Sequence, residues 1–410
     1  MPWKETCAVE ERMRFVVECE LGQEAMAELC RRYGISRRTG YKWLGRFLEE
    51  GGGGLKDRSR APRCHRNQVM PELEAAVLSA RSVHPTWGAK KLRVLLERKR
   101  PGIVWPARST MAEMLKRHGL VVPRKRRRRT PPQEAPFAAC ARANAVWCVD
   151  FKGWFRTGDG SRCDPLTLSD AYSRYLLRCQ ALARTDGMSV RPVMEAAFRE
   201  YGLPGAIRSD NGAPFASRGV AGLSPLSIWW IKLGITPERI EPGRPEQNGR
   251  HERMHLTLKG ETASPPARSP RAQQARFDGF RREFNEVRPH EALEMKTPAC
   301  CYEPSSRQYP CSLADPEYPP GWARRRVCDR GEFRWKVSKV FLGRALDGEL
   351  VGLEPLGGRY WRVWFSQLAL SVLDEGRQRI LTPREGRQAG LDEALLRSSF
   401  RAAPGDPQEP

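Results

Sequence analysis

Two aspartates occupy positions where a carboxylate is costly unless a cation neutralises it. Asp150 lies near the end of the apolar run 146–151, and Asp210 directly follows the strand expected at 206–209. Each could simply form a turn, but together in a basic chain they favour a metal site. Hard carboxylate oxygens suit Mg²⁺ or Mn²⁺, and a pair of such ions about 3.5–4 Å apart can drive phosphodiester chemistry. The sequence therefore predicts a site of this class.

The charge of the chain points to a polyanionic partner. The 410 residues include 71 Lys and Arg against 48 Asp and Glu, which gives a net charge of +23. Residues 1–50 carry nine basic and nine acidic side chains, whereas residues 51–144 carry 22 basic and six acidic ones. A solvated surface would spread such an excess more evenly, so the concentration indicates binding to nucleic acid.

The first 55 residues have the outline of a helix-turn-helix DNA-binding domain. Apolar residues at helical spacing lead to a turn at Gly34, and Ser36 can cap the next helix. We expect Leu44, Phe47 and Leu48 to face the interior of this domain. The side chains expected to face DNA are Arg37, Arg38, Lys42 and Arg46. A plain helical hairpin would be the alternative, and the glycines 51–54 are expected to be a flexible break.

A second helical unit and a basic linker continue the DNA-binding region. Residues 65–122 are predicted to form a winged-helix-like domain, with Lys90 and Lys91 on DNA. Residues 123–144 form a linker expected to lie along phosphates, a contact that is sensitive to salt and blind to sequence. Its six consecutive cations are Arg124, Lys125, Arg126, Arg127, Arg128 and Arg129.

Strand patterns dominate the rest of the chain. The segment 145–303 alternates short strands with helices, which is typical of an α/β domain with a mixed sheet. Alternating aromatic and apolar residues in 304–384, with turn signals at 347–348 and 357–358, predict a small β-barrel. The tail 385–410 is weakly patterned and is expected to be disordered.

Three ordered motifs in the α/β segment carry a family resemblance. The residues at 147–151 (WCVDF), 209–212 (SDNG) and 245–253 (PEQNGRHER), closing with 257–259 (TLK), closely resemble the catalytic core of insertion-sequence transposases of the retroviral-integrase type. The resemblance implies a ribonuclease H-like core with a five-stranded mixed sheet. It also implies a catalytic and metal-binding triad of Asp150, Asp210 and Glu252 that holds two Mg²⁺ or Mn²⁺ ions.

The choice of glutamate rests on the local pattern of the family. Glu246 follows Asp210 by 36 positions, close to the usual interval, and Glu252 follows it by 42. Glu252 is chosen because the family places its acid three residues after the glycine that Gly249 matches. The resemblance assigns Lys259 to the DNA end, and Asn248 and His255 are also expected to bind DNA. Helical spacing predicts one shared face for residues 252, 255, 256 and 259.

Three other features of the sequence do not lead us to predict a further functional site. The segment 251–255 satisfies H-E-x-x-H, the helix of zinc peptidases. That class would leave both aspartates and the basic region unexplained, so we set it aside. Asp170 is expected to be a turn or capping residue. The twelve cysteines show no C-x-x-C spacing, so a finger-type zinc site is not indicated.

These patterns together predict a DNA transposase. The family resemblance implies that it would bind the terminal inverted repeats of a mobile element, hydrolyse a phosphodiester there and transfer the freed strand to target DNA, as a homo-oligomer on DNA. A sequence-specific DNA-binding regulator with an inactive core is the alternative. No run approaches the roughly 18 apolar residues of a membrane helix, and a cytoplasmic, nucleoid-associated bacterial protein is expected.

Overall fold

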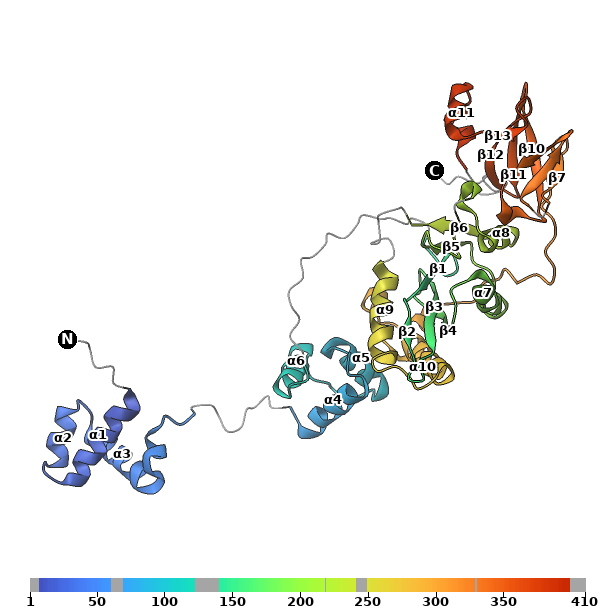
Figure 1. The fold of residues 1–410 in the computed structure, drawn as a ribbon. Coiled ribbons are helices and arrows are strands. Elements are labelled where there is room, and N and C mark those ends of the chain that lie inside the picture. The colour runs from blue at the N-terminus through green and yellow to red at the C-terminus, as the bar shows by residue number, and fades with distance from the viewer. Residues whose placement is uncertain are drawn as a thin grey trace, which may run out of the picture. The chain divides into compact units, whose positions relative to one another are not determined.

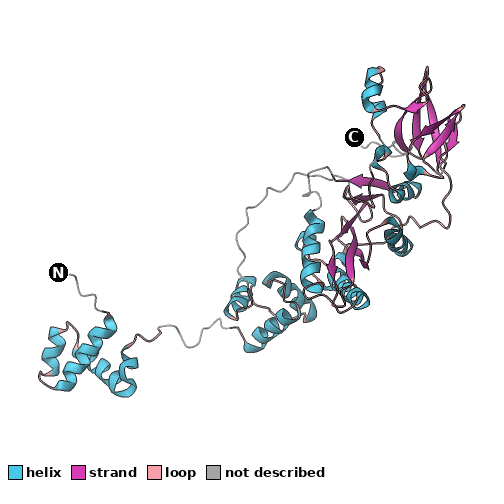
Figure 2. Cartoon of the chain, in the orientation of Figure 1, coloured by secondary structure: helices cyan, strands magenta, loops and turns pink. Residues whose placement is uncertain are grey.

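The computed structural model describes residues 7–59, 69–121, 140–217, 219–240, 249–328 and 330–398. The chain divides into two compact units, Met1–Pro71 and Glu72–Pro410 (Figures 1 and 2). Several expected functional residues lie outside the described ranges, namely the basic run 124–129, Glu246 and Asn248. None of the described helices combines the length and apolar character needed to cross a membrane.

The first unit confirms the helix-turn-helix outline. It comprises α1 (Ala8–Leu21), α2 (Met26–Arg32), α3 (Arg37–Glu50) and the 3-10 helix η1 (Gly51–Leu55). Gly34 takes a left-handed φ of 66° in the turn before α3. The Ser36 hydroxyl then accepts a hydrogen bond from the Thr39 N–H at 3.2 Å, which caps α3 as expected.

The packing of α3 differs in two ways from the sequence expectation. Trp43 is its main buried residue, whereas Leu48 is 69% exposed. Gly40 lets α3 approach its neighbours, because a Cβ there would lie 2.6 Å from the Cys30 sulfur. The glycines 51–54 are not a flexible break: they form η1, and a Cβ on Gly54 would lie 2.3 Å from the Arg46 carbonyl oxygen.

A second helical module opens the larger unit. It consists of α4 (Pro71–Val83), α5 (Ala89–Lys99) and α6 (Arg108–Arg117) around a core that includes Trp87, Leu92 and Met111. Within the described residues 69–121 there is no strand, so the wing of the expected winged-helix-like domain is not seen.

The central domain is built on a mixed sheet of six strands in the order β2–β3–β1–β5–β6, with β4 paired to β3. These strands are β1 (Val146–Phe151), β2 (Phe155–Arg156), β3 (Arg162–Asp170), β4 (Leu176–Leu182), β5 (Ala206–Ser209) and β6 (Thr236–Arg239). Strand β1 runs antiparallel to β3 and parallel to β5. The five-stranded mixed sheet is therefore confirmed, and the two-residue β2 adds a sixth strand.

Helices cover both faces of this sheet (Figure 1). They are α7 (Gly187–Tyr201), α8 (Pro225–Lys232), α9 (Gly249–Thr262) and α10 (Pro270–Arg282). Side chains of α7 and α8, such as Phe198 and Trp230, pack with Trp147 of β1 in one apolar core. Leu258 of α9 and Phe277 of α10 belong to a second core, with strand residues from β3 and β4. The result is a three-layer α/β/α domain.

The C-terminal sheet module (residues 323–398) is not a closed barrel. Its five-stranded antiparallel sheet has the order β13–β12–β11–β10–β7, and β8 and β9 form a separate hairpin. The strands are β7 (Ala323–Arg326), β8 (Glu332–Trp335), β9 (Ser338–Phe341), β10 (Leu350–Gly357), β11 (Tyr360–Phe365), β12 (Leu368–Asp374) and β13 (Arg379–Ile380). In the described residues no pairing joins β13 to β7, so the sheet stays open.

Two short helices follow this sheet, where the sequence indicated loss of structure. They are α11 (Pro383–Gln388), capped by the Thr382 hydroxyl, and α12 (Glu393–Leu396). The expected irregular tail therefore does not begin at residue 385.

Within the larger unit, polar contacts join the second helical module to the central domain. His84 Nδ1 lies 2.9 Å from Glu283, Thr86 donates to Glu261 at 2.7 Å, and Lys90 lies 3.3 Å from Glu291. The Arg288 guanidinium binds Glu261 at 2.9 Å. Lys90 and Lys91, both expected on DNA, therefore lie at this contact.

The charged form of Lys91 is destabilised at this contact. Burial, together with the positive charge of Arg288, lowers the pKa of Lys91 from 10.5 to about 8. Lys91→Met is therefore expected to raise the melting temperature of the chain at pH 7. The gain in melting temperature should shrink as the pH rises from about 8 to about 10.5. Over this range Lys91 of the folded wild type is deprotonated, so the buried positive charge no longer destabilises it. Thermal melts across this pH range measure it, with Lys90→Met as the matched control. A gain independent of pH would contradict the assigned cause.

Candidate active site

Sheet topology brings Asp150 and Asp210 to one edge of the central sheet. Strands β1 and β5 are parallel neighbours, with Cys148 paired to Arg208. Both aspartates lie two residues beyond this pair, Asp150 within β1 and Asp210 just after β5. The carboxyl ends of adjacent parallel strands meet at the same edge, which is where α/β sheets place ligand-binding groups. Residues 60 positions apart are thus brought to neighbouring strand ends.

The turn after β5 holds the Asp210 carboxylate in place. Its Oδ1 accepts a hydrogen bond from the Gly212 N–H at 3.2 Å. A Cβ on Gly212 would lie 3.1 Å from Asp210 Oδ2, so glycine leaves room for the carboxylate. The Asn211 side chain donates to the Ile240 carbonyl at 2.8 Å and ties the turn to the segment after β6. The turn formed by residues 209–212 (SDNG) therefore holds the Asp210 carboxylate in a defined position.

Helix α9 presents two different faces to this region. His251 and His255 are buried, 4% and 5% exposed, and face the sheet, whereas Glu252 and Lys259 are exposed. The predicted common face of 252, 255, 256 and 259 is thus wrong for His255, which turns inward while Leu256 is 72% exposed. The structure does not place His255 on the surface where we expected a DNA contact.

The two histidines converge on Thr167 of β3, a residue the sequence did not single out. The Thr167 hydroxyl oxygen lies 2.6 Å from His251 Nε2, 2.7 Å from His255 Nε2 and 3.1 Å from the Asp150 carbonyl oxygen. Thr167 is the register partner of Asp150 in the β1–β3 pairing. The signal in the sequence was a threonine between two leucines, Leu166 and Leu168, in the middle of β3.

Burial keeps both imidazoles neutral at pH 7. It lowers the pKa of His251 to about 4. It also lowers the pKa of His255 to about 2, with smaller contributions from His251 and Lys152. The Nδ1 atom of His255 lies 3.8 Å from Asp150 Oδ2, and the Asp150 side chain is 18% exposed. A partly open carboxylate thus adjoins two neutral rings.

Glu252 follows His251 directly on α9 and is exposed to solvent. Its neighbour His251 belongs to the cluster with Asp150 and His255, but Glu252 itself is not part of that cluster. Its role as third ligand stays a prediction.

The remaining expected DNA contacts divide by location. On α3, Arg37, Arg38 and Lys42 are exposed, while Arg46 is half-buried with its guanidinium 5.0 Å from the Trp43 ring centre. Lys259 is exposed on α9. Their contacts with DNA stay predictions.

Asp170 is a buried turn residue, as expected. Its Oδ2 accepts hydrogen bonds from the Ser173 N–H at 2.7 Å and the Ser173 hydroxyl at 2.6 Å. Its Oδ1 accepts the Asn144 N–H at 2.8 Å. With 1% exposure, this carboxylate is occupied in holding the loop that follows β3.

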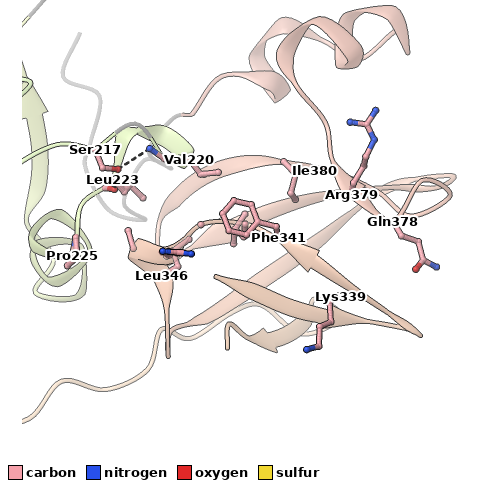
Figure 3. Close-up of a pocket in the computed structure, with 15 residues that line it drawn as sticks. Ser217, Val220, Leu223, Pro225, Lys339, Phe341, Leu346, Gln378, Arg379 and Ile380 are labelled. Atoms are coloured by element: carbon pink, nitrogen blue, oxygen red, sulfur yellow. Dashed lines mark hydrogen bonds between the residues drawn. The ribbon is translucent and has the colours of Figure 1, made fainter. Parts of the chain in front are cut away.

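A cavity of about 830 Å³ lies where the segment 217–225 meets the C-terminal sheet module. Phe341, Leu346 and Ile380 contribute apolar walls, and Lys339 and Arg379 lie at its margin (Figure 3). The described residues that line it include no carboxylate. The cavity therefore offers no carboxylate ligand for a divalent metal ion, and the candidate metal site stays at Asp150 and Asp210.

Comparison with known protein families identifies the domains. Two models described as integrase core domain match residues 141–245 and 233–298. A helix-turn-helix domain model matches residues 11–63, and a homeodomain-like domain model matches residues 39–115. The chain thus joins DNA-binding helical domains to an integrase-type core.

Insertion-element proteins are among its relatives. The IS407 protein of Burkholderia multivorans is 28% identical over 238 residues, which cover 56% of this chain and 82% of that protein. The IS136 protein of Agrobacterium fabrum is 31% identical over 170 residues, 38% of this chain and 82% of that protein. A solved magnesium complex of the HTLV-2 integrase catalytic core domain is 13% identical, with a TM-score of 0.30, and covers 40% of this chain and 99% of that one. From the family models and the insertion-element relatives, the chain belongs to the insertion-sequence transposases with a retroviral-integrase-like core.

Proposed function

We propose that the chain is a DNA transposase that cuts the ends of its own mobile element and joins them to target DNA. The single observation that carries this proposal is the placement of Asp150 and Asp210 at neighbouring ends of two parallel strands in an integrase-type core. Family membership supports a polynucleotidyl transferase. The helix-turn-helix domain and the basic region 51–144 support DNA as its substrate.

The donor set at the strand edge fits hard divalent cations. Asp150 and Asp210 offer carboxylate oxygens, and Glu252 is an exposed third carboxylate on the adjacent helix. Mg²⁺ and Mn²⁺ favour such oxygen ligands and tolerate a partly open site. When bound, a pair of these ions would activate the attacking oxygen and stabilise the leaving oxygen of an in-line displacement.

The proposed reaction has two transfers at phosphorus. In the first, a water oxygen bonds to the phosphorus at the element end, and the bond from phosphorus to the 3′ oxygen breaks, leaving a 3′-hydroxyl and a 5′-phosphate. In the second, that 3′-hydroxyl attacks a target phosphodiester, and the target strand leaves with its own 3′-hydroxyl. The turn 210–212 keeps one carboxylate oriented, and Thr167 holds the β1 backbone at Asp150. Lys259 would anchor a phosphate of the DNA end.

A cleavage assay tests the proposal directly. The probe is duplex DNA that flanks the gene on either side, with a shuffled duplex as control. We expect the full chain to nick the flanking DNA only with Mg²⁺ or Mn²⁺, and EDTA to abolish nicking, because three carboxylates without cations would repel the scissile phosphate. Specific binding without any nicking would instead support a DNA-binding regulator with an inactive core. Because joining two ends requires two active sites, we propose an oligomer on DNA.

The exposed face of α3 should determine which DNA is bound. Arg37 and Arg38 are exposed at the start of the helix, where a recognition helix contacts base edges. Arg37→Ala combined with Arg38→Ala should weaken binding to the element end at least about thirtyfold, since a bidentate base contact contributes about 1–3 kcal/mol. The matched control removes the same charge from Arg14 and Arg31, exposed on α1 and α2. Equal losses in both pairs, measured by competition against shuffled DNA, would show a general charge effect only.

A further inference from the structure

The histidines of the H-E-x-x-H segment are unused by the proposed reaction, yet they adjoin one of its carboxylates. Asp150, His251 and His255 each offer one ligand atom, and these three atoms lie within 4.8 Å of one another. His251 and His255 are buried, whereas the side chain of Asp150 is partly open to solvent. A cluster of two imidazoles and a carboxylate is a typical donor set for a transition-metal ion.

The hydrogen bonds at Thr167 determine which nitrogen of each histidine ring carries the proton. The hydroxyl has one proton and two lone pairs, and it has three close partners. The Asp150 carbonyl can only accept, so the hydroxyl proton goes to it. Both histidines must then donate their Nε2–H to the Thr167 oxygen. In its neutral form, each ring then carries its lone pair on Nδ1.

The two Nδ1 lone pairs have different surroundings. Ser169 Oγ lies 3.3 Å from His251 Nδ1 and can donate to it, so both nitrogens of His251 have partners. The Nδ1 atom of His255 instead points to Asp150 Oδ2 at 3.8 Å. A metal ion bound to both atoms would bridge this gap, because an imidazole nitrogen and a carboxylate oxygen are both common ligands of divalent transition metals. In an octahedral site with bonds of about 2.1 Å, two ligands lie about 3.0 Å apart when adjacent and about 4.2 Å when opposite, which brackets this separation.

We propose that a divalent ion held by Asp150 takes Nδ1 of His255 as a direct nitrogen ligand, an inference that rests on the proposed function of Asp150. The centre would then combine oxygen and nitrogen donors and favour Mn²⁺, Co²⁺ or Zn²⁺ over Mg²⁺ more strongly than carboxylates alone would. Thr167 is the positioning residue that fixes the ring, through its contact with His255 Nε2. The arrangement differs from a zinc peptidase, in which both histidines bind the metal.

Magnetic resonance of bound Mn²⁺ tests the ligand directly. The full chain is freed of metal with EDTA and titrated with Mn²⁺, and free Mn²⁺ is counted by its solution signal. Pulsed measurements on the bound ion then report directly coordinated nitrogen. We expect a nitrogen coupling in wild type, and a changed coupling when the histidines carry ¹⁵N, which identifies the donor as histidine without any substitution.

Substitutions assign the nitrogen to one ring. His255→Asn keeps a hydrogen-bonding side chain beside Thr167 and should abolish the coupling and weaken Mn²⁺ binding at least about tenfold. It should also reduce the preference for Mn²⁺ over Mg²⁺. The matched control is His118→Asn, because His118 is exposed on the second helical module beside Glu74. His251→Asn should retain the coupling. Circular dichroism checks that each variant is folded.

A failure of this inference can be distinguished from a failure of the proposed function. Absence of nitrogen coupling in wild type, or an unchanged coupling in His255→Asn, overturns the inference even if metal-dependent DNA cleavage is observed. An Asp150→Asn variant that binds Mn²⁺ as tightly as wild type would instead overturn the proposed role of Asp150, and with it the proposed function. If only the labelled wild type can be prepared, the ¹⁵N effect alone supports or refutes a histidine ligand.

Discussion

Asp210→Asn is expected to lower the single-turnover rate of strand cleavage at least about a thousandfold without weakening DNA binding. The amide oxygen of asparagine can still accept the Gly212 N–H that now binds Asp210 Oδ1. The turn should therefore persist while the negative charge disappears. A loss of several kcal/mol of metal-based transition-state stabilisation corresponds to a factor of this size, since about 1.4 kcal/mol is tenfold.

The matched control for this variant is Asp278→Asn. Asp278 is an exposed carboxylate on α10 in the same domain, where it accepts a hydrogen bond from Gln274 at 2.9 Å. It should cleave at the wild-type rate. The combination of Asp150→Asn with Asp210→Asn should be scarcely slower than either alone, because groups that act as one unit are not additive. Cleavage by Asp210→Asn within tenfold of wild type would remove this carboxylate from the proposed mechanism.

The second large effect concerns the identity of the third carboxylate. Glu252→Gln should abolish cleavage to a similar extent, whereas Glu246→Gln should leave it near the wild-type rate. Glu252 lies on α9 beside His251, whose ring is fixed by Thr167, so the helix that carries Glu252 is anchored to the sheet next to Asp150. The prediction requires its exposed side chain to turn toward an ion at that edge.

The measurement is the same cleavage assay, run with Mg²⁺ and with Mn²⁺ for both variants. Glu246 and Glu252 are replaced by their isosteric amides, so each is the control for the other. Loss of cleavage in Glu246→Gln alone would transfer the role to that residue. Equal loss in both would indicate that charge near the DNA end, rather than one ligand, controls the reaction.

Local patterns predicted much of this architecture because they depend on neighbours in sequence. Ser36 caps α3, and Gly34 provides the turn before it, since capping and left-handed backbone are properties of a few adjacent residues. The strand that carries Asp150 follows from a short apolar run, and the strand before Asp210 was also expected from the sequence. The same reasoning failed where packing overrode it. The glycines 51–54 suggested a flexible break, yet Gly54 is buried where α3 and η1 meet.

The C-terminal module shows the same limit on a larger scale. Alternation in β11 correctly predicts that Val363 and Phe365 are buried, but it does not predict the burial of Trp364 between them, which is 5% exposed. Alternation does not specify which edges pair, and closure into a barrel depends on whether the first and last strands meet. In the described residues they do not, and β8 and β9 pair with each other instead.

The amino-acid sequence alone determined the kinds of groups available: two strand-end aspartates, a glutamate on a helix, a capped basic helix and a strongly basic region. Tertiary structure decided which of them meet. Parallel pairing of β1 with β5 brings Asp150 and Asp210 to one edge, and the rotation of α9 turns His255 inward against Thr167 while leaving Glu252 outside. The physical reason is that strand register and helix rotation are set by burying apolar surface contributed by residues far apart in the chain, such as Leu258 and Phe277, which no local pattern contains.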